Sequence, residues 1–596
     1  MEISRFIPPG KLLTIVHDAG AWYSWAVPQK EKFSISSYGA GYRLWKVLCS
    51  PEFKEVLLSP LQGPRREQVL RSWEAHGVDL DRSGGKAAAA LRGICDRSSF
   101  DSIEEYSGFA GDLAGHLSLL NRIQHSLDFR AQMPPFANEA DYSSSEKLAD
   151  YALRRDTLLY RLTSAYLGDF SIKPGGVVLM ALKSHLELLT AMSAAVVIKE
   201  RFPGVHISLA EHRYEYFSLD PYMGKLKESG ALLKVFDSVV EQGHGAQGLI
   251  AAMLDRLQAG ESVGGFIGEQ VFKTRPNPLA SRRVPPGDPS SFSPEPLLWT
   301  RLSYAGCYWG RCAFCAQGHQ GEPGVPVTAF DAAASADYIA DCAAAGYRKF
   351  SFADEAIGGA NLGSFCEKIL EKGLDIRWSC RCRCDMEAAP GLFELMRRAG
   401  CVEVLFGLET SCERVQGLMH KYERPIPPVA LEKLFRAVNA AGMGLHISFM
   451  GGFPGETPEE LRRTVEFVKG LLKEMDNGTY VFNQFELLPG SKMSADPAAF
   501  GIRADVPAGD MPLSFGYTPV DGIAGETRET NSLVPSLRDE LGASLGWGTS
   551  GSGPAAAVMR YLYFSSGHGL IFKSLRKNPL RNPRLNAVPG VFSAAV

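Results

Sequence analysis

The sequence predicts an α/β protein made of two parallel-sheet domains joined by a linker. Short apolar strands alternate with helices twice, over residues 176–265 and again over residues 298–490, and this alternation is typical of parallel sheets with crossover helices. Proline and glycine punctuate residues 274–297, where we place the main domain boundary. The chain has 596 residues, of which 45% are hydrophobic and 22% charged, so it can bury the cores of several domains.

The first domain, residues 1–273, is expected to be a doubly wound, Rossmann-like sheet with a helical insertion at about 60–165. In such sheets, ligands bind at the carboxyl ends of the strands. Pro203 and Gly204 end the clearest helix, and an apolar strand follows them. The expected elements are strands at 11–16, 176–182, 205–210 and 235–240 and helices at 186–202 and 246–257.

The second domain, residues 298–495, is expected to be a partial (β/α)6 TIM barrel because it holds six strand–helix units. Glycine and proline are frequent after it and the periodicity is weak, which predicts a small C-terminal subdomain over 496–596 that caps the site or binds substrate. No acidic residue follows Glu540, so the chain ends in a basic tail. The expected barrel elements are strands near 299–305, 349–353, 376–383, 402–408, 444–450 and 480–487 and helices at 331–345, 394–399, 431–441 and 458–475.

Composition and charge argue against several functional classes. The formal net charge is −3, with 63 Lys plus Arg against 66 Asp plus Glu, so we expect no nucleic-acid partner. The chain has no run of 18 apolar residues and no apolar signal core at its N-terminus, so we expect no membrane partner and a cytoplasmic location. Thiols stay reduced there, and the twelve cysteines, ten of them from Cys307 to Cys412, need an explanation other than disulfides.

Three cysteines, Cys307, Cys312 and Cys315, fall within nine residues directly after the first barrel strand. A loop this short can wrap one metal centre, and three thiols are one fewer than a closed structural zinc site or a fully thiolate-held cluster uses. A 4Fe–4S cluster bound by three thiolates keeps one iron open to a small molecule, at the end of the barrel where such folds carry their chemistry. Phe314 would shield this cluster from water. The alternative is a zinc site completed by a distant ligand such as His319.

The cysteine loop and six strand-end motifs resemble the radical S-adenosylmethionine (SAM) superfamily. Within it they are similar to the cobalamin-binding, class B branch and to the branch that matures peptides and natural products. The usual spacing has three residues between the first two cysteines, whereas four separate Cys307 from Cys312, as in some longer loops of the cobalamin-binding branch. The six motifs are Phe352–Glu355, Trp378–Asp385, Phe406–Ser411, Met419–Lys421, Gly451–Thr457 and Leu488–Ser491.

The resemblance implies that the three cysteines bind a 4Fe–4S cluster and that SAM binds at its open iron. Asp354 and Glu355 would then lie near the SAM ammonium, and Arg383 would face the SAM carboxylate. Glu409 at the end of the fourth strand, together with Phe314, completes the expected cofactor-binding set.

Cys380, Cys382 and Cys384 alternate with Arg381 and Arg383 along one predicted strand. Alternation places the three cysteines on one face of that strand. If Arg383 points into the barrel, they point outward into the helix layer. We therefore expect small buried hydrophobic residues here rather than a second metal site.

The resemblance also implies that residues 1–273 are a divergent cobalamin-binding domain, and Val239–Gly245 is similar to the end of that domain in the family. The Asp-x-His-x-x-Gly signature that supplies an axial histidine is absent. This leaves the lower cobalt ligand open, and His185, His212 and His244 lie near expected strand ends. The expected cofactors are the 4Fe–4S cluster, SAM and cobalamin.

The function that the resemblance favours is a cobalamin-dependent C-methyltransferase. A 5′-deoxyadenosyl radical would remove hydrogen from an unactivated carbon of a natural product or precursor peptide, and methylcobalamin would donate the methyl group. We expect a small-molecule or peptide substrate and an external electron donor of the flavodoxin or ferredoxin type. Two alternatives stay open: radical SAM chemistry without methylation, such as rearrangement, epimerisation or bond formation, and a non-catalytic metal-binding protein. A transfer-RNA methylthiotransferase is disfavoured because only Cys49 and Cys95 precede the triad.

Overall fold

The computed structural model describes the greater part of the chain, and the described residues form two compact units. Unit 1 comprises Met1–Ser99, Glu105–Pro294 and Ala508–Pro512, and unit 2 comprises Phe100–Glu104, Glu295–Pro507 and Leu513–Val596. The main division therefore falls inside the linker predicted at 274–297. The residues described are 1–7, 34–102, parts of 105–120, 142–182, 187–214, 217–241, 246–268, 297–302, 307–316, 331–386, 388–475, 477–512 and 514–545.

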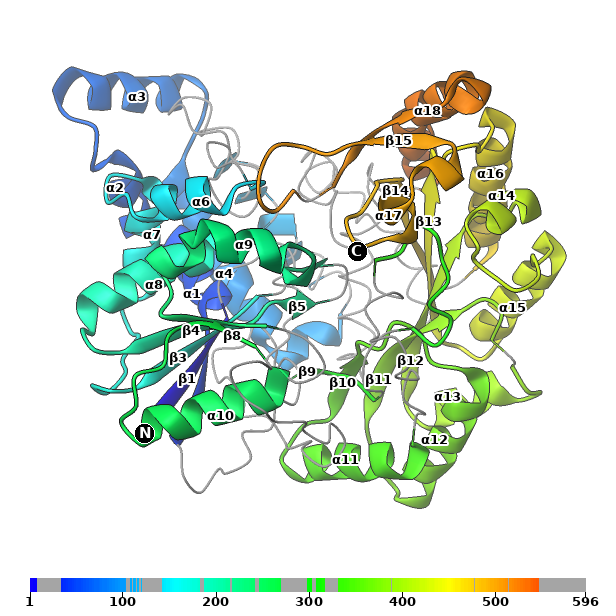
Figure 1. Ribbon diagram of the computed structural model, residues 1–596, viewed down its shortest axis with the longest axis horizontal. Coiled ribbons are helices and arrows are strands. Elements are labelled where there is room, and N and C mark those ends of the chain that lie inside the picture. The colour runs from blue at the N-terminus through cyan, green and yellow to red at the C-terminus, as the bar shows by residue number, and fades with distance from the viewer. Residues whose placement is uncertain are drawn as a thin grey trace. The chain divides into compact units, whose positions relative to one another are not determined.

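Unit 1 is built on a six-stranded sheet in the order β2-β1-β3-β4-β7-β8, and every pairing in it is parallel (Figure 1). This confirms the predicted parallel α/β sheet. β1 and β2 were not predicted, and the strand expected at 11–16 lies outside the described residues. The strands are β1 (Glu2–Ile7), β2 (Ser34–Gly39), β3 (Val177–Ala181), β4 (His206–Glu211), β7 (Ser238–Val240) and β8 (Gly265–Ile267), with a small hairpin of β5 (Arg213–Tyr214) and β6 (Phe217–Ser218).

Helices cover both faces of this sheet, with α8 and α10 on opposite sides in Figure 1. The residues predicted as helical at 60–165 form α3, α4, α6 and α7 among the described positions. The helices are α1 (Ala40–Leu48), α2 (Glu52–Leu58), α3 (Gly63–Ala75), α4 (Leu80–Cys95), α6 (Ser145–Ala152), α7 (Leu158–Tyr166), α8 (Glu187–Arg201), α9 (Met223–Ser229) and α10 (Ala246–Gln258).

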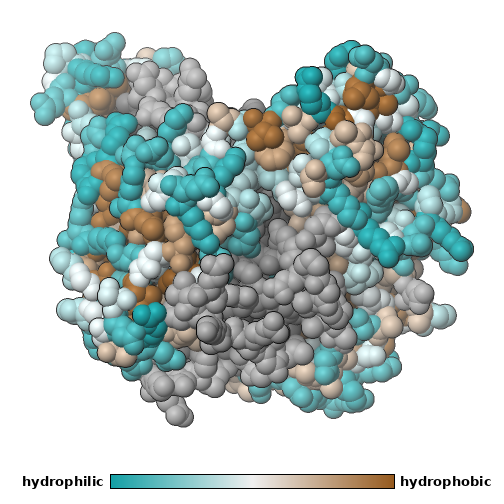
Figure 2. Space-filling view, in the orientation of Figure 1, coloured by the Kyte–Doolittle hydropathy of each residue, from teal (hydrophilic) through white to brown (hydrophobic). Residues whose placement is uncertain are grey.

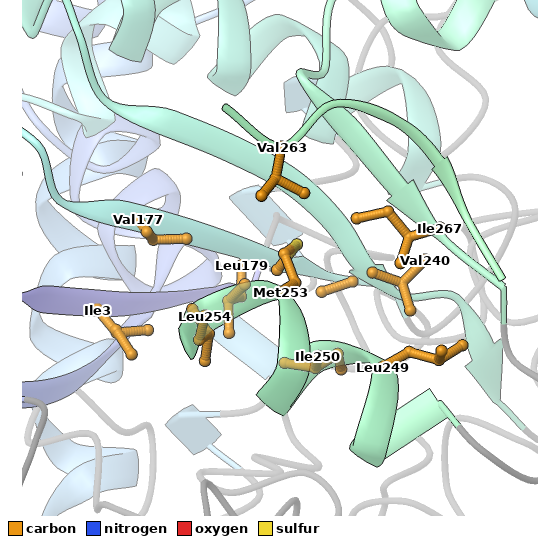
Figure 3. Close-up of a cluster of buried hydrophobic side chains, with 11 residues drawn as sticks. Ile3, Val177, Leu179, Val240, Leu249, Ile250, Met253, Leu254, Val263 and Ile267 are labelled. Atoms are coloured by element: carbon orange, nitrogen blue, oxygen red, sulfur yellow. The ribbon is translucent and has the colours of Figure 1, made fainter. Parts of the chain in front are cut away.

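The core of unit 1 under α10 is a cluster of buried aliphatic side chains from several strands and one helix (Figure 3). Val177 and Leu179 alternate along β3 and both face this cluster, where Met253 and Leu254 of α10 meet them. Burying a side chain of this size contributes about 1.5–3 kcal/mol. The strictly apolar sequence of β3 is explained by burial of both of its faces.

A short segment from late in the chain, Ala508–Pro512, belongs to unit 1. The Asp510 carboxylate accepts a hydrogen bond from the backbone N–H of Ser145 at 2.7 Å, at the first residue of α6. The hydroxyl of Tyr222 donates to the carbonyl of Pro512. Because helix N-termini favour negative charge, Asp510 stabilises the start of α6.

Unit 2 holds a six-stranded parallel sheet whose order follows the chain, β14-β13-β12-β11-β10-β9. β9 and β14 are not paired in the part of the chain that the structure describes, so the sheet is a partial barrel, as predicted. Each strand lies within a few residues of its predicted position. The strands are β9 (Leu297–Thr300), β10 (Lys349–Phe352), β11 (Arg377–Arg383), β12 (Cys401–Glu409), β13 (Gly444–Gly451) and β14 (Gly478–Gln484).

The longer helices of unit 2, α11, α12, α15 and α16, lie along the outer side of this sheet (Figure 1). The four helices named in the prediction correspond to α11, α13, α15 and α16. The helices are α11 (Ala332–Ala344), α12 (Gly359–Glu371), α13 (Leu392–Arg398), α14 (Glu413–Leu418), α15 (Pro428–Ala440), α16 (Pro458–Glu474) and α17 (Lys492–Ala495).

Of the region 496–596, where the sequence predicts a small C-terminal subdomain, the structure describes residues up to 545. These residues, apart from the segment held by unit 1, belong to unit 2. They form a hairpin of β15 (Ile502–Asp505) and β16 (Gly516–Pro519), followed by the 25-residue helix α18 (Asp521–Leu545). α18 packs on α16 and on β13 and β14, and this tertiary contact explains a helix that the weak sequence periodicity did not indicate.

Charged and polar side chains cover most of the helix surfaces visible in Figure 2, and hydrophobic residues appear there in scattered groups. None of the helices that the structure describes is long and apolar enough to cross a membrane.

Candidate functional site

The cysteine loop follows β9 in unit 2, and residues 307–316 of it are described. The side chain of Cys312 is buried, whereas Cys307 and Cys315 are partly exposed. None of the twelve cysteines, all of which lie within the described residues, forms a disulfide. Phe314 is partly buried, and its ring centre lies 5.8 Å from the Nζ atom of Lys421.

Arg383, the last residue of β11, connects this loop to the barrel. Its Nη1 atom lies 3.9 Å from the Sγ atom of Cys312, and its Nε and Nη2 atoms form a two-pronged ion pair with Asp385 at 2.9 and 2.7 Å. The guanidinium is buried, and its centre lies 4.7 Å from the ring centre of Trp309 and 5.1 Å from that of Tyr422. Arg383 therefore points into the cysteine loop, with most of its donors engaged by the chain itself.

A buried ion pair stands beside Arg383. The Nζ atom of Lys421 lies 3.1 Å from the Oε1 atom of Glu409, and both side chains are almost fully buried. Burial opposes the charge on Lys421, but Glu409 and the thiol of Cys312 outweigh it and raise the pKa of Lys421. Glu409 adopts a left-handed backbone conformation with a φ of +60°. A strained residue of this kind persists only where its surroundings fix it, and such residues cluster at functional sites.

Asp354 and Glu355 lie just beyond β10 and hold the chain at the end of β9. The buried Asp354 carboxylate accepts a hydrogen bond from the backbone N–H of Leu302 at 2.8 Å. Glu355 forms a two-pronged ion pair with Arg301 at 2.6 and 2.7 Å. Both carboxylates therefore have partners in the chain and fix the residues that lead into the cysteine loop. The contact with a SAM ammonium stays a prediction.

The three cysteines of the third strand do not share one environment. Cys380 and Cys382 are buried, with their Sγ atoms 3.9 Å apart, and Cys380 lies near Cys366 of α12 in the helix layer, as predicted. Cys384 is buried as well, but its Sγ atom lies 3.9 Å from the carbonyl oxygen of Gly407. It faces the Lys421 and Glu409 pair, which corrects the prediction of an outward position. Cys384 follows the last residue of β11, so strand alternation no longer sets its direction.

The turn after β13 carries another buried carboxylate, that of Glu456. Glu456 accepts a hydrogen bond from the backbone N–H of Gly452 at 2.8 Å through Oε2, while its Oε1 atom has no partner. Burial raises the pKa of Glu456 to about 8, so this acid stays protonated at neutral pH. Gly452 has a φ of +83° and would bring a Cβ atom within 2.0 Å of Asn531, which explains glycine at this position.

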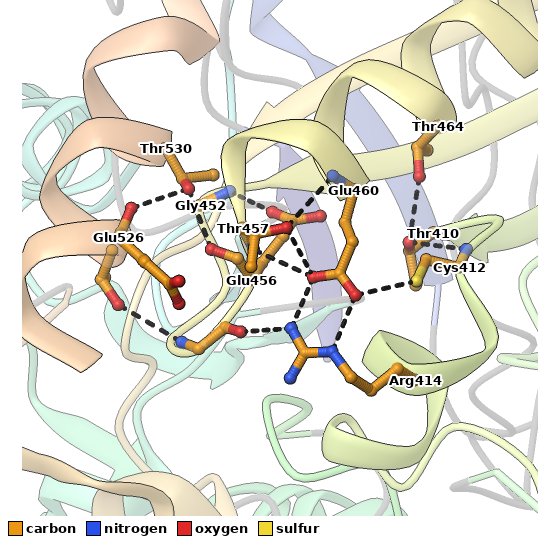
Figure 4. A network of polar contacts seen from close by, with 12 residues as sticks. Thr410, Cys412, Arg414, Gly452, Glu456, Thr457, Glu460, Thr464, Glu526 and Thr530 are labelled. Carbon is orange, nitrogen blue, oxygen red and sulfur yellow. Dashed lines mark hydrogen bonds and ion pairs between the residues drawn. The ribbon is translucent and has the colours of Figure 1, made fainter. Parts of the chain in front are cut away.

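A polar network continues from this turn into α16 (Figure 4). Thr457 and Glu460 form a reciprocal capping box at the start of the helix. Arg414 of α14 forms an ion pair with Glu460, and the thiol of Cys412 lies 3.2 Å from the same carboxylate. The network ties α14 to α16 and so fixes the segment that follows α14.

Side chains that pack against the surrounding helices mark the outer face of the barrel sheet, and the remaining side chains of each strand therefore mark its inner face. Trp378 packs against Phe365 of α12 and Phe406 against Phe435 of α15, so these side chains point outward. Alternation then directs Ser379 inward, where its hydroxyl lies 3.3 Å from that of Ser351 on the neighbouring strand.

The inner face carries one further carboxylate, that of Glu403 in β12, which follows a β-bulge. Trp378 opposes Cys401 and Ser379 opposes Glu403, so Val402 is an extra residue in β12. Phe406 points outward and the ladder from Glu403 to Phe406 is uninterrupted, so alternation directs Glu403, like Ser379, inward. Glu403 is buried, its Oε1 atom has no hydrogen-bond partner, and burial raises its pKa to about 8. Sequence reasoning missed Glu403 because it lies near the start of β12, whereas candidate residues were sought at the ends of the strands.

Residues 302–468, which contain the cysteine loop and most of the barrel, match the family described as the radical SAM superfamily. This part of the chain is a radical SAM domain. A stretch of 106 residues is 33% identical to the uncharacterised methyltransferase PH0819 of Pyrococcus horikoshii, and it spans 17% of this chain and 22% of that protein.

Two solved structures were also found to be similar to the chain. One is the radical S-adenosylmethionine methyltransferase TsrM from Kitasatospora setae, with cobalamin and a [4Fe-4S] cluster bound; it is 15% identical, with 69% of this chain and 87% of that chain covered and a TM-score of 0.46. The other is the cobalamin-dependent S-adenosylmethionine radical enzyme OxsB with aqua-cobalamin bound; it is 13% identical, with 64% of each chain covered and a TM-score of 0.39.

The chemistry of the radical SAM domain fits a thiolate-bound iron–sulfur cluster. Three free thiols follow one another on one loop, and a cluster held by them carries negative charge. Arg383 and Lys421 both act on Cys312, where two cations would offset that charge. Within the described ranges, no three His, Cys, Asp or Glu side chains are already grouped as a metal site. The cluster ligands Cys307, Cys312 and Cys315 therefore stay a prediction from their spacing.

Of the three histidines near the ends of the unit 1 strands, the structure describes one. His212 is fully buried, and its Nε2 atom lies 2.8 Å from the carbonyl oxygen of Val240. This histidine is part of the core that joins β4 to β7. His185 and His244 lie outside the described residues.

Proposed function

We propose that the chain is a cobalamin-dependent radical SAM C-methyltransferase that acts on an unactivated carbon of a natural product or precursor peptide. The observation that carries the cobalamin assignment is the strand order of unit 1, which precedes the radical SAM domain. The order β2-β1-β3-β4 reverses direction between β1 and β3. Open parallel sheets bind their ligands at such a switch point, beyond the carboxyl ends of the strands. In unit 1 this point lies beyond Ile7 and Ala181.

The side chains of this protein contribute to the chemistry in three ways. When bound, the cluster and SAM supply the radical and cobalamin supplies the methyl group. Asp354 and Glu355 fix the chain ahead of the cysteine loop, and Arg383 fixes the loop itself. The Lys421 ammonium adds positive charge in a buried environment, where electrostatic interactions are stronger than in water.

Methyl transfer, as opposed to another radical outcome, is supported by the partial match to a protein named as a methyltransferase. The substrate we propose is a small molecule or peptide, and the reductant is an external donor of the flavodoxin or ferredoxin type. We place the reaction in the cytoplasm, where the free thiols of the cysteine loop stay reduced.

The test is anaerobic reconstitution of the full chain with iron, sulfide and hydroxocobalamin, followed by desalting and a UV–visible spectrum. We expect a broad iron–sulfur band together with cobalamin bands at about one cobalamin per chain. The matched control is the Cys307→Ser, Cys312→Ser and Cys315→Ser triple variant. It should lose the iron–sulfur band and keep cobalamin, because the two cofactors are assigned to different units.

An iron–sulfur band without retained cobalamin would leave a radical SAM enzyme and contradict methyl transfer through cobalamin. Cobalamin that is lost together with the cluster in the triple variant would contradict the assignment of the two cofactors to separate units.

A further inference from the structure

Three consecutive backbone carbonyls accept hydrogen bonds from the cysteine loop or from Arg383, which contacts that loop. They belong to Met419, His420 and Lys421. The carbonyl of Met419 accepts a hydrogen bond from the backbone N–H of Ala313 at 2.9 Å. The carbonyl of His420 accepts one from the indole N–H of Trp309 at 2.9 Å. The carbonyl of Lys421 accepts one from the Nη2 atom of Arg383 at 2.5 Å. We call residues 419–421 the carbonyl platform.

The C-terminal end of α14 determines the backbone conformation of the carbonyl platform. The N–H of Lys421 bonds the carbonyl of Gln416 and the N–H of His420 bonds that of Gly417, which is the pattern of a Schellman motif. This motif needs a left-handed residue directly after the helix, usually glycine. Here that residue is His420, with a φ of +50°. Its conformation turns the three carbonyls away from the helix and toward the cysteine loop.

The cysteine loop is enlarged between its first two cysteines. Four residues separate Cys307 from Cys312, one more than in the usual superfamily spacing. Among them is Gly310, with a φ of +59°, a conformation that glycine adopts at little cost. Trp309 precedes it, and the centre of its ring lies 5.0 Å from the guanidinium of Arg311 and 4.7 Å from that of Arg383. An enlarged loop has more conformations to lose on binding a metal, so it benefits from an additional anchor.

We propose that Trp309 is a positioning residue for the iron–sulfur cluster. Its indole N–H fixes the enlarged cysteine loop to His420, and its ring packs on Arg383, the side chain that contacts the sulfur of Cys312. Ala313 provides the second anchor on the other side of Cys312. The two anchors bracket Cys312 and hold it in place relative to Cys307 before iron binds. This role depends on the radical SAM domain and is independent of cobalamin and methyl transfer.

The test uses Trp309→Phe and Trp309→Leu in the full chain, reconstituted anaerobically with iron and sulfide. Trp309→Phe keeps an aromatic ring over Arg383 and loses only the indole donor, whereas Trp309→Leu loses both. The readouts are iron and sulfide per chain after desalting, and the rate at which the iron–sulfur absorbance bleaches in excess chelator. The control is Glu423→Gln, which removes the exposed ion pair of Arg311 on the same loop and leaves Trp309 in place.

We expect Trp309→Phe to lose its cluster about fivefold faster than the wild type, as the loss of a hydrogen bond worth about 1 kcal/mol implies. Trp309→Leu should lose it faster still, and Glu423→Gln should match the wild type. The change in the electron paramagnetic resonance signal of the reduced cluster on SAM addition should be weakened in both tryptophan variants, because a displaced loop presents the open iron differently. Bleaching rates and spectra equal to the wild type in both variants would overturn the proposal. If Trp309→Leu fails to fold, Trp309→Phe decides alone.

Discussion

Replacement of Glu403 by glutamine should remove a large pH dependence from the stability of unit 2. In the folded state, burial raises the pKa of Glu403 to about 8, against an ordinary value of 4.5. The folded protein therefore holds this proton at neutral pH while the unfolded chain has released it. Stability is greatest below pH 4.5 and is lost as the pH rises toward 8. At about 1.36 kcal/mol per pH unit, the loss between pH 5 and pH 7 is about 2.7 kcal/mol. Glutamine has about the same size as glutamate and carries no charge. The Glu403→Gln variant should therefore show no such loss of stability between pH 5 and pH 7.

The assay is urea unfolding of the apo-protein at pH 5, 6 and 7, read by pulsed hydrogen exchange at one fixed labelling pH. Peptides from β11 and β12 report unit 2 alone. The stability of Glu403→Gln relative to the wild type should rise by about 2.7 kcal/mol from pH 5 to pH 7. Glu371→Gln, on the exposed surface of α12, is the matched control and should follow the wild type. A variant difference that does not change with pH would refute the assignment of a protonated Glu403 in the folded state.

Three further predictions concern the residues around the cysteine loop. Asp354→Ala leaves the buried N–H of Leu302 without its acceptor and should destabilise unit 2 by about 1–3 kcal/mol in calorimetry; an unchanged unfolding temperature would contradict this. Lys421→Met leaves Glu409 as an unpaired buried charge and should cost about 3–5 kcal/mol, most of which the added Glu409→Gln change should restore; a double variant as unstable as the single one would count against the pair. His420→Gly should keep wild-type stability and cluster content, whereas His420→Val should lose about 1–2 kcal/mol because a β-branched residue resists the left-handed conformation; equal unfolding midpoints would argue against strain at this position.

The barrel strands could be predicted closely from the sequence because apolar residues recur at every second position, as in Lys-Phe-Ser-Phe of β10 and Leu-His-Ile-Ser-Phe of β13. The structure places both strands within a residue or two of the prediction. β1 and β2 could not be found in this way. Their sequences, Glu-Ile-Ser-Arg-Phe-Ile and Ser-Ile-Ser-Ser-Tyr-Gly, contain few apolar residues. Their place in the sheet is fixed by pairing with each other and with β3, a long-range effect that local sequence does not record.

The missed helix α18 shows a related effect of tertiary context. It contains three glycines and Pro535, which disfavour a helix interior. Val534 and Leu541 nevertheless lie fully buried on its inner face. Packing against α16 and two barrel strands outweighs the low helix propensity, since most helical stability in proteins comes from an apolar face buried in this way.

The candidate site shows why strand alternation predicted some of its residues and misplaced others. Alternation holds only along an uninterrupted strand ladder, and it correctly sent Cys380 outward. It failed at Cys384, one residue beyond the end of β11. Glu403 follows the alternation of β12 and was missed because it lies near the start of that strand. The misplaced Cys384 lies where the ladder ends, and it faces the Lys421 and Glu409 pair beside the cysteine loop. The residues that a periodic pattern misplaces in this domain are therefore the ones to mutate first.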